Sequence, residues 1–302
     1  MSYIVDNAII MAAGTSSRFV PLSYEIPKAL IEVRGEILIE RQIRQIQEAG
    51  ISPVYIVVGY KKEQFYYLRE KFGVIIIEND EYLERNNNSS IYAVKDILKN
   101  SYICSADNYF SENPFEREVR EAYYAAVFAD GDTDEWCMSE DQQGYISSVS
   151  IGGHNSWYML GHVFWDEAFS TRFTEILEEI YQKPETAGLL WESIFAKNLD
   201  TLKMKMRKYP AGMIFEFDTL DELRQFDSSY ISNTRSQILK SIAEKFRCDE
   251  SEIVQCSALK NSNNAADGFT FCIRGCCYTY THKHDEGEKK CQEKSLRRIY
   301  RQ

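Results

Sequence analysis

Short apolar runs alternate with amphipathic segments along the first third of this sequence, and this alternation constrains the fold more than any other feature. The apolar runs span residues 7–13, 54–60, 74–80 and 102–110. The segments between them, which have helical periodicity, span residues 36–50, 62–73 and 86–100. Strands that are apolar on both faces and alternate with helices are typical of a parallel sheet covered on both sides. We therefore predict a Rossmann-like α/β fold with a mixed, mostly parallel sheet and helices on both faces.

The rhythm changes near Tyr123, where four short apolar runs follow one another with only turn-rich sequence between them. Closely spaced strands of this kind favour antiparallel pairing, so we expect an antiparallel insertion here. A boundary falls near residue 227, which divides the chain into a domain of residues 1–227 and an appendage of residues 228–302. In the appendage, one helix over 230–247 and a hairpin that turns at Arg274-Gly275 predict a small α+β unit.

Charge and hydropathy exclude several classes of protein. The chain has 302 residues and a net charge of −11, which argues against broad binding to nucleic acid because that requires a basic surface. No apolar run approaches the roughly 20 residues of a membrane span. The N-terminus lacks a basic region before its apolar stretch, so we expect a cytoplasmic protein without a signal peptide. The sequence does not define the oligomeric state.

The loop after the first apolar run carries hydroxyls and two spaced cations. Gly14 ends the run, Arg18 follows shortly afterwards, and a Pro27-Lys28 pair comes ten residues later. Such a loop lies at the carboxyl edge of the sheet, where backbone N–H groups bind anionic oxygens and arginine binds phosphate through two hydrogen bonds. An ordinary strand-to-helix turn is the alternative. The loop is neither a P-loop nor a GxGxxG fingerprint, because the glycines of both are missing.

The stretch "MAAGTSSRFVPLSYEIPKAL" resembles the signature of nucleotidyltransferases, in which a small-residue loop precedes an Arg and a Pro-Lys pair. The chain is similar in particular to bacterial CTP:phosphocholine cytidylyltransferases. This resemblance continues through "NNNSSIYAVKDILKNSYICSADNYF", "TDEWCM" and "FEFDTLDEL", and covers roughly residues 5–227. It implies the nucleotidyltransferase variety of the Rossmann-like fold. It also implies an enzyme that converts CTP and phosphocholine to CDP-choline and pyrophosphate.

The resemblance assigns roles to individual residues. Arg18 and Lys28 would act as the catalytic cations that neutralise charge on the phosphoryl groups. Gly59 would let the nucleotide lie against the backbone. The nucleotide-binding set implied by the resemblance is Ala12, Ala13, Gly14, Thr15, Ser16, Ser17, Gly59, Asn87, Ser90 and Ala106. Asn87 and Ser90 also stand at the start of a predicted helix, where side-chain oxygens cap free N–H groups.

Asp107 and Asp218 are the predicted metal ligands. Each ends an apolar strand, and Mg²⁺ prefers one or two carboxylates together with phosphate oxygens. The alternative for either residue alone is a helix cap or a turn. Ser105 stands where the family usually has the first acid of an Asp-x-Asp pair, so weak Mg²⁺ binding would point to this position.

A choline group requires aromatic faces and a nearby carboxylate, because its quaternary nitrogen has no N–H to donate. Trp136 follows two acidic residues, Trp191 precedes Glu192, and Tyr109 stands two residues after Asp107. We rank Trp136 first, then Trp191, then Tyr109, with Glu216 as the balancing carboxylate. Aromatic residues more often belong to the core, and that alternative stays open for each of them.

Two other functions remain open at this stage. The first is nucleotidyl transfer to a different phosphorylated substrate, such as a sugar 1-phosphate, whose site would present more Asn, Gln and Glu than Trp. The second is a catalytically silent regulatory subunit that binds nucleotide. No Ser-His-Asp or Cys-His signature suggests a competing chemistry.

The last 75 or so residues lie beyond the resemblance. Residues 240–285 faintly resemble the opening of choline kinase-type folds, but the chain ends long before such a kinase is complete, so we predict no kinase activity. We expect the segment to be a remnant of such a kinase or a docking element. Six cysteines fall in this part, and free thiols are the default in a reducing compartment. A zinc site formed by cysteines together with His282, His284 and Cys291 is the less favoured alternative, as is a regulatory disulfide.

Overall fold

The computed structural model describes residues 2–260, 266–281 and 297–299. The chain forms two compact units, which are described separately. Unit 1 comprises Met1–Gly14 and Glu36–Glu216, and unit 2 comprises Thr15–Gly35 and Phe217–Gln302. The signature loop is thus divided between the units after Gly14. The predicted domain boundary near residue 227 stays a prediction.

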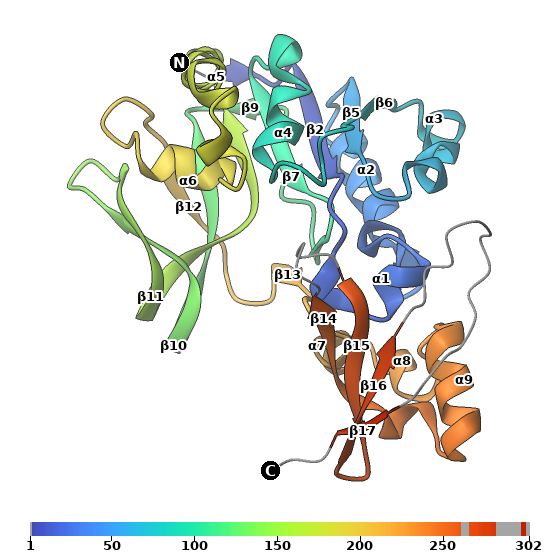
Figure 1. The fold of residues 1–302 in the computed structure, drawn as a ribbon. Coiled ribbons are helices and arrows are strands. Elements are labelled where there is room, and N and C mark those ends of the chain that lie inside the picture. Colours follow the sequence, from blue (N-terminus) through green and yellow to red (C-terminus); the bar gives the residue numbers. More distant parts are fainter. Residues whose placement is uncertain (1, 261–265, 282–296, 300–302) are drawn as a thin grey trace. The chain divides into compact units, whose positions relative to one another are not determined.

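A seven-stranded sheet organises unit 1 (Figure 1). Its parallel part consists of β2 (Asn7–Ala12), β5 (Val54–Val58), β6 (Ile75–Glu78) and β7 (Ser101–Ser105). The order across the sheet is β12-β10-β11-β7-β2-β5-β6, in which β11 pairs antiparallel with β7. The predicted mixed α/β fold is therefore confirmed, and three of the predicted apolar runs correspond to β2, β5 and β6. The fourth run, residues 102–110, divides into β7 and a separate strand, β8 (Asn108–Phe110), which belongs to another sheet.

Helices connect these strands, as the hydrophobic periodicity predicted. They are α2 (Leu38–Glu48), α3 (Tyr67–Phe72), α4 (Asn88–Tyr92), α5 (Glu167–Tyr181) and α6 (Trp191–Ala196), with short 3₁₀ turns η3 (Lys62–Phe65), η4 (Lys95–Ile97) and η5 (Pro184–Thr186). In α2, Ile39, Ile43 and Ile46 are fully buried on one stripe. The Asp166 side chain caps α5 by accepting a hydrogen bond from the backbone N–H of Phe169.

The antiparallel insertion is present, but it is built from two long strands instead of four short ones. These are β10 (Tyr123–Glu140) and β11 (Ile146–Trp165), which pair antiparallel. The turn-rich stretch at residues 141–144 forms the turn that joins β10 and β11, as predicted. The other predicted strand ends instead form bulges, with a register shift between Ala129 and Asp132 and positive φ at Gly131 and Gly152. A bulge bends a strand without ending it, so turn residues alone did not distinguish the two cases.

Short elements complete unit 1, and two of them position residues of the predicted site. Strand β8 (Asn108–Phe110) pairs antiparallel with β13 (Ile214–Glu216). The remaining strands are β1 (Tyr3–Ile4), β4 (Glu36–Ile37), β9 (Glu118–Val119) and β12 (Lys205–Lys208), which pairs parallel with β10.

Unit 2 combines two segments that are far apart in the sequence. The first carries η1 (Ser17–Phe19), α1 (Leu22–Glu25), η2 (Lys28–Leu30) and β3 (Glu32–Val33). The second carries α7 (Leu220–Phe226), α8 (Ser229–Ser232), α9 (Gln237–Phe246) and η6 (Glu250–Glu252). An antiparallel sheet follows, formed by β14 (Val254–Lys260), β15 (Ala266–Ile273), β16 (Cys276–Thr281) and β17 (Arg297–Ile299).

The predicted single helix over 230–247 is wrong, because α8 and α9 are separate helices. Arg235 between them has φ of 61°, and the Ser236 side chain caps α9 by accepting from the backbone N–H of Leu239. The predicted hairpin is confirmed, since β15 and β16 join at Arg274-Gly275 and both residues have positive φ.

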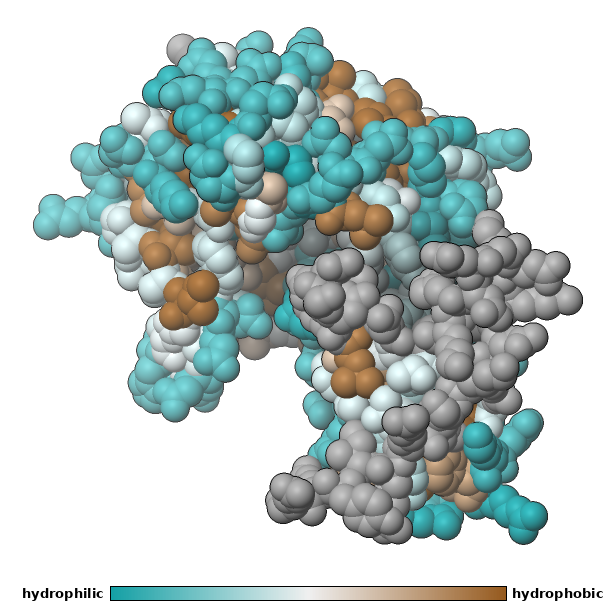
Figure 2. Space-filling view, viewed as in Figure 1, coloured by the Kyte–Doolittle hydropathy of each residue, from teal (hydrophilic) through white to brown (hydrophobic). Residues whose placement is uncertain are grey.

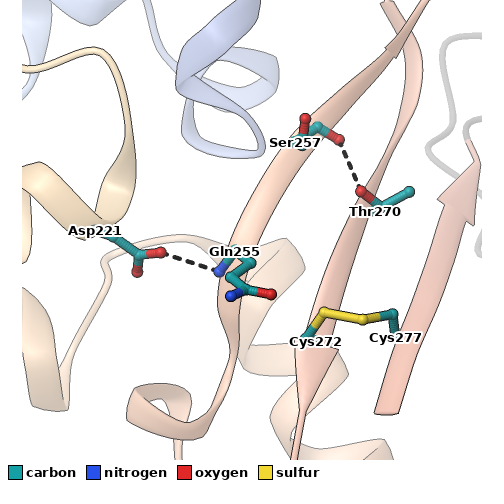
Figure 3. Close-up of a disulfide and its surroundings, with 6 residues drawn as sticks. All are labelled: Asp221, Gln255, Ser257, Thr270, Cys272 and Cys277. Atoms are coloured by element: carbon teal, nitrogen blue, oxygen red, sulfur yellow. Dashed lines mark hydrogen bonds between the residues drawn. A yellow bond between two sulfur atoms is a disulfide. The ribbon is translucent and has the colours of Figure 1, made fainter. Parts of the chain in front are cut away.

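Two cysteines of this hairpin form a disulfide. Cys272 on β15 and Cys277 on β16 occupy directly opposite positions, and their sulfur atoms are bonded (Figure 3). The expectation of free thiols is therefore wrong for this pair. It holds for Cys104, Cys137, Cys248 and Cys256. His282, His284 and Cys291, which the zinc alternative requires, lie outside the described residues.

In the described part of the chain, no helix is both long enough and apolar enough to span a membrane. The face drawn in Figure 2 is largely hydrophilic, notably over α5, with apolar residues in small groups. Large exposed apolar side chains such as Ile75, Leu83 and Ile151 are single residues on separate elements, as is usual for protein surfaces.

We expect loss of the disulfide to lower the stability of unit 2. Cross-linking residues five apart in sequence restricts the unfolded chain and contributes about 2 kcal/mol in the chain-entropy model. The Cys272→Ser/Cys277→Ser variant should therefore unfold at a lower urea concentration than the oxidised wild type. Reduction of the wild type should have the same effect, whereas Cys248→Ser, which leaves the disulfide intact, should have little. An oxidised double variant as stable as the wild type would contradict the prediction.

Candidate active site

The two predicted cations and one predicted metal ligand lie together in unit 2. Nη1 of Arg18 is 2.6 Å from Oδ2 of Asp218, and Nζ of Lys28 is 3.5 Å from Oδ1 of the same carboxylate. Lys28 and Asp218 are separated by 190 positions in the chain. The structure therefore brings Arg18, Lys28 and Asp218 into one ion-paired group, whereas the sequence predicted Asp218 as a metal ligand.

The two cations differ in their exposure. The side chain of Lys28 is only 4% exposed and its Nζ lies 5.8 Å from the ring centre of Phe19, whereas the side chain of Arg18 is 72% exposed. A buried ammonium requires a paired charge, and Asp218 supplies it. Asp218 is oriented in turn by its own backbone N–H, which donates to Oε2 of Glu222 at 2.8 Å. Arg18 is thus the member of the group that is available to an anion from solvent.

The local backbone explains why the chain turns away from the direction of β2 before it reaches Arg18. Ser16 adopts a left-handed conformation with φ of 50°, and its carbonyl accepts a hydrogen bond from the N–H of Phe19. This tight turn forms η1 and makes Phe19 a buried anchor while Arg18 remains exposed. The hydroxyl-rich sequence Thr15-Ser16-Ser17 suits this turn because short polar side chains tolerate such backbone angles.

The nucleotide-binding residues predicted in unit 1 lie at the carboxyl ends of parallel strands. Ala12 ends β2, and the carbonyl of Ala13 accepts from the N–H of Tyr60, which follows β5. The N–H of Ala106, after β7, donates to the carbonyl of Met11. Asp107 follows Ala106 directly and precedes β8. The predicted residues at the ends of β2, β5 and β7 therefore share one edge of the sheet, where α/β folds bind ligands.

Gly59 is packed too tightly to accept any side chain. A Cβ built on it would lie 2.6 Å from Cγ of Tyr82, closer than real Cβ contacts occur. The aromatic ring of Tyr82 thus lies directly against the backbone at the end of β5. Gly14, by contrast, has open space around the same position. Glycine at residue 59 is therefore a steric requirement of the fold as well as a predicted nucleotide contact.

Asn87 and Ser90 have partners other than the helix cap that we predicted. Oδ1 of Asn87 accepts from the backbone N–H of Trp191 at 2.8 Å, and its Nδ2 donates to Oε2 of Glu192 at 3.0 Å. Its side chain makes no cap hydrogen bond on α4, so the capping prediction is wrong. Ser90 accepts from Nδ2 of the buried Asn79 at 3.2 Å. The start of α4 is thus joined to the start of α6.

Two of the predicted choline-binding aromatics belong to the core. Trp191 is 1% exposed, stacks on Tyr124 and meets Trp165 edge-on, so it has no face to present to a ligand. Tyr109 is 7% exposed, and the guanidinium of Arg41 already lies over its ring at 4.7 Å. The structure therefore does not support direct choline contact by Trp191 or Tyr109. The packing of these two side chains excludes them as choline contacts, and their positions in the sequence did not reveal that packing.

Glu192 is a half-buried carboxylate that the sequence indicated only as a neighbour of Trp191. Besides its hydrogen bond from Asn87, it accepts from the Tyr124 hydroxyl at 3.5 Å. Burial raises the pKa of Glu192 to about 7, although the hydrogen bonds from Asn87 and Tyr124 oppose this shift. Burial also raises the pKa of Tyr124, and the charges of Glu192 and Glu216 add to that effect.

Glu216 in unit 1 interacts electrostatically with two tyrosines, Tyr124 and Tyr158. Trp136 on β10 is partly buried against the core, and the adjacent Cys137 pairs with Tyr158 on β11. Burial raises the pKa of Tyr158, and the negative charges of Glu135 and Glu216 raise it further. We call Tyr124, Glu135, Trp136, Tyr158, Glu192 and Glu216 the acidic-aromatic group. Tyr124 was missed in the sequence, because nothing near it distinguishes it from a core tyrosine.

We expect the Gly59→Ala variant to be destabilised by about 1–3 kcal/mol, because the new methyl group must displace Tyr82. Thermal unfolding measures the effect. Gly188→Ala is the matched control, since a Cβ at Gly188 would meet no atom within 4 Å and the backbone there has no positive φ. Equal stability of the two variants would show that the close packing at residue 59 is absent in solution.

We expect Glu192 to make the protein less stable as the pH rises from about 4.5 to 7. Its carboxyl is protonated in the folded state up to a pKa of about 7, whereas the ordinary pKa of a glutamate is 4.5, so ionisation is penalised only in the folded state. Because of Glu192, the free energy of unfolding of the wild type should be about 1–3 kcal/mol lower at pH 8 than at pH 5, and Glu192→Gln should remove this difference. Urea unfolding at the two pH values measures it. The exposed Glu48→Gln should keep the wild-type dependence. A wild-type pH dependence in Glu192→Gln would refute this account.

Comparisons with known proteins agree with this architecture. The family model of the MobA-like NTP transferase domain matches residues 8–190. The choline-phosphate cytidylyltransferase of Streptococcus pneumoniae is 33% identical over 221 residues, which are 73% of this chain and 96% of that protein. The 2-aminoethylphosphonate cytidylyltransferase of Lancefieldella rimae is 37% identical over 235 residues, which are 76% of this chain and 95% of that protein.

Solved structures give the same result. The CTP:phosphocholine cytidylyltransferase of Streptococcus pneumoniae superposes with a TM-score of 0.72 at 33% identity and covers 75% of this chain and 99% of that one. The inositol-1-phosphate CTP transferase of T. maritima, at 16% identity and a TM-score of 0.56, covers 74% of this chain and 93% of that one and shows the fold alone. The chain has a nucleotidyltransferase fold, carries the signature loop and is similar to these relatives. It therefore belongs to the MobA-like NTP transferase family and is a nucleotidyltransferase.

Proposed function

We propose that the enzyme transfers a cytidylyl group from CTP to phosphocholine and so forms CDP-choline and pyrophosphate. The observation that carries the proposal is the acidic-aromatic group of unit 1. Trp136 and Tyr158 are only partly buried and can supply π faces, whereas Tyr124 stacks on Trp191 inside the core. Glu135 and Glu216 place negative charge near Tyr158. Aromatic faces with a carboxylate suit a quaternary ammonium, which attracts π electrons and negative charge but donates no hydrogen bond.

The chemistry requires little beyond positioning and charge. A phosphate oxygen of phosphocholine attacks the α-phosphorus of CTP in line, the bond from that phosphorus to the bridging oxygen breaks, and pyrophosphate leaves. The attacking phosphate is already anionic near neutral pH, so no general base is required. Arg18, the exposed cation, binds the phosphoryl oxygens, and the buried Lys28 adds positive charge that offsets the charge developing on them. The exposed guanidinium of Arg18 is suited to contact two oxygens at once.

We include Mg²⁺ in the proposal, with Asp107 and Asp218 as its carboxylate ligands. The donor chemistry fits, because both are acids at strand ends and Mg²⁺ prefers oxygen ligands. When bound, the ion supplies additional positive charge for phosphate oxygens. In unit 2, Asp218 already balances two cations, so its carboxylate is held in a fixed orientation by Arg18 and Lys28.

Transfer to 2-aminoethylphosphonate is the second candidate, which the Lancefieldella rimae relative favours by its name. Its primary ammonium donates three hydrogen bonds and requires acceptors rather than π faces. Glu192 and Glu216 offer such acceptors, whereas Trp136 does not. A sugar 1-phosphate remains as a further alternative, and it lacks the positive charge that the acidic-aromatic group would bind. A silent nucleotide-binding subunit is the non-enzymatic alternative.

Pyrophosphate release with Mg²⁺ and CTP tests the proposal directly. The acceptors to compare are phosphocholine, phosphoethanolamine, 2-aminoethylphosphonate and several sugar 1-phosphates. We expect the highest kcat/KM with phosphocholine and loss of the rate when EDTA removes the metal. A higher kcat/KM with 2-aminoethylphosphonate would select the second candidate. Release only with a sugar phosphate would refute cation recognition, and no release with any acceptor would favour the silent subunit.

We expect Trp136→Ala to raise the KM for phosphocholine about 5- to 30-fold and to leave the KM for CTP within about twofold. The reason is the loss of one π face from the cation site. Trp136→Phe keeps an aromatic face and should retain most of the affinity. Phe128→Ala removes an exposed aromatic from the same strand and serves as the control. An unchanged KM in Trp136→Ala would exclude this residue from the site.

A further inference from the structure

The C-terminal part of the chain contacts the segment that carries the catalytic cations. Helix α1, of only four residues, lies in the sequence between Arg18 and Lys28. The Tyr24 hydroxyl on this helix donates to the carbonyl of Gly268 on β15 at 2.7 Å. The Tyr24 ring lies 6.3 Å from that of Phe269, which is fully buried. A helix this short has little stability of its own, so its position depends on such tertiary contacts.

A second contact joins α1 to α9. Oε1 of Glu25 accepts from the backbone N–H of Ile238 at 2.8 Å. This N–H belongs to the first turn of α9, where backbone donors lack partners within the helix. A carboxylate at this place is also favoured by the positive end of the helix dipole. The last two residues of α1 are therefore both bound by residues that come more than 200 positions later.

The same C-terminal part fixes the helix that follows Asp218. Oδ2 of Asp221 on α7 accepts from the N–H of Gln255 at the start of β14 (Figure 3). The guanidinium of Arg224 donates to the carbonyl of Ile253 at 2.7 Å and to that of Glu250 at 2.8 Å. Arg18 and Asp218, which are ion-paired, are thus both flanked by elements held by η6, β14 and β15.

The two cytidylyltransferase relatives are matched by only about three quarters of this chain. The match to the choline-phosphate cytidylyltransferase covers 96% of that protein and 73% of this chain. The match to the 2-aminoethylphosphonate cytidylyltransferase covers 95% of that protein and 76% of this chain. About a quarter of this chain therefore has no counterpart in either. The sequence suggested a kinase remnant or a docking element for the tail, whereas its contacts are with the catalytic segment.

We propose that α9 and the β14–β16 sheet position Arg18 and Lys28 for nucleotidyl transfer, and that Tyr24 and Glu25 are the positioning residues that connect them. This inference rests on the proposed reaction but not on the identity of the acceptor. The C-terminal segment is then a working part of the nucleotide site. Loss of its contacts lowers the ability of the two cations to bind and stabilise the phosphates of CTP, while the acceptor site in unit 1 is unaffected.

Tyr24→Phe tests the proposal, since it removes one hydrogen bond and keeps the ring. We expect kcat to fall about 3- to 10-fold and the affinity for CTP, measured by calorimetry, to weaken similarly. The affinity for cytidine, which lacks phosphates, and the KM for phosphocholine should stay within about twofold. Tyr66→Phe is the matched control, because Tyr66 donates a hydrogen bond of the same length, 2.7 Å, to Glu78 in unit 1. Wild-type kcat and CTP affinity in Tyr24→Phe would overturn the proposal.

A double-mutant cycle separates positioning from general destabilisation. If Tyr24 acts in part through Arg18, Tyr24→Phe should slow the Arg18→Ala variant by a smaller factor than it slows the wild type. Multiplied losses would overturn the proposal. Glu25→Gln keeps an oxygen acceptor for Ile238 and should retain CTP affinity, whereas Glu25→Ala should lose it about 3- to 10-fold. The affinity for CTP tests the inference even if phosphocholine is not the acceptor, because the identity of the acceptor affects only the turnover rate.

Discussion

The carboxylate of Asp218 is the interaction on which the arrangement of unit 2 depends. Lys28 is almost completely buried, and an ammonium without a partner there would carry a large desolvation cost. Asp218 removes that cost and simultaneously binds the exposed Arg18. The carboxylate comes from a segment 190 residues away from Lys28, so the cation segment has this arrangement only when the C-terminal segment has folded onto it. Catalytic charge and tertiary structure are therefore coupled within one unit.

The two units hold opposite kinds of recognition chemistry. Unit 2 presents cations that suit phosphate oxygens, and unit 1 presents carboxylates and aromatic rings that suit a positively charged nitrogen. This separation explains how a chain with a net charge of −11 can act on a nucleoside triphosphate, because the positive charge is concentrated at a few positions. The raised pKa of Glu192 indicates that its surroundings in unit 1 disfavour an ionised carboxylate.

The sequence predicted the local elements well and the tertiary contacts poorly, for physical reasons. The apolar runs and the stripe of Ile39, Ile43 and Ile46 follow from periodicity, which is a local property. Trp136 and Trp191 both stand beside acidic residues, and only packing shows that Trp191 is enclosed by Tyr124 and Trp165. Likewise, bulges at Gly131 and Gly152 use the same residues as turns, so two long strands looked like four short ones.

The contacts of Tyr24 and Glu25 show why the role of the tail was not accessible from the sequence. Tyr24 bonds to Gly268 and packs near the ring of Phe269, and Glu25 bonds to the first turn of α9. Each of these partners lies more than 200 residues later in the chain. A hydrogen bond to a backbone carbonyl or N–H places no requirement on the partner's side chain, so no residue pattern at Gly268 or Ile238 reports it. The Asp218 ion pair is different, since both of its sides are charged residues in recognisable motifs. Side-chain pairs leave a signature in sequence, whereas support through the backbone becomes visible only in the folded structure.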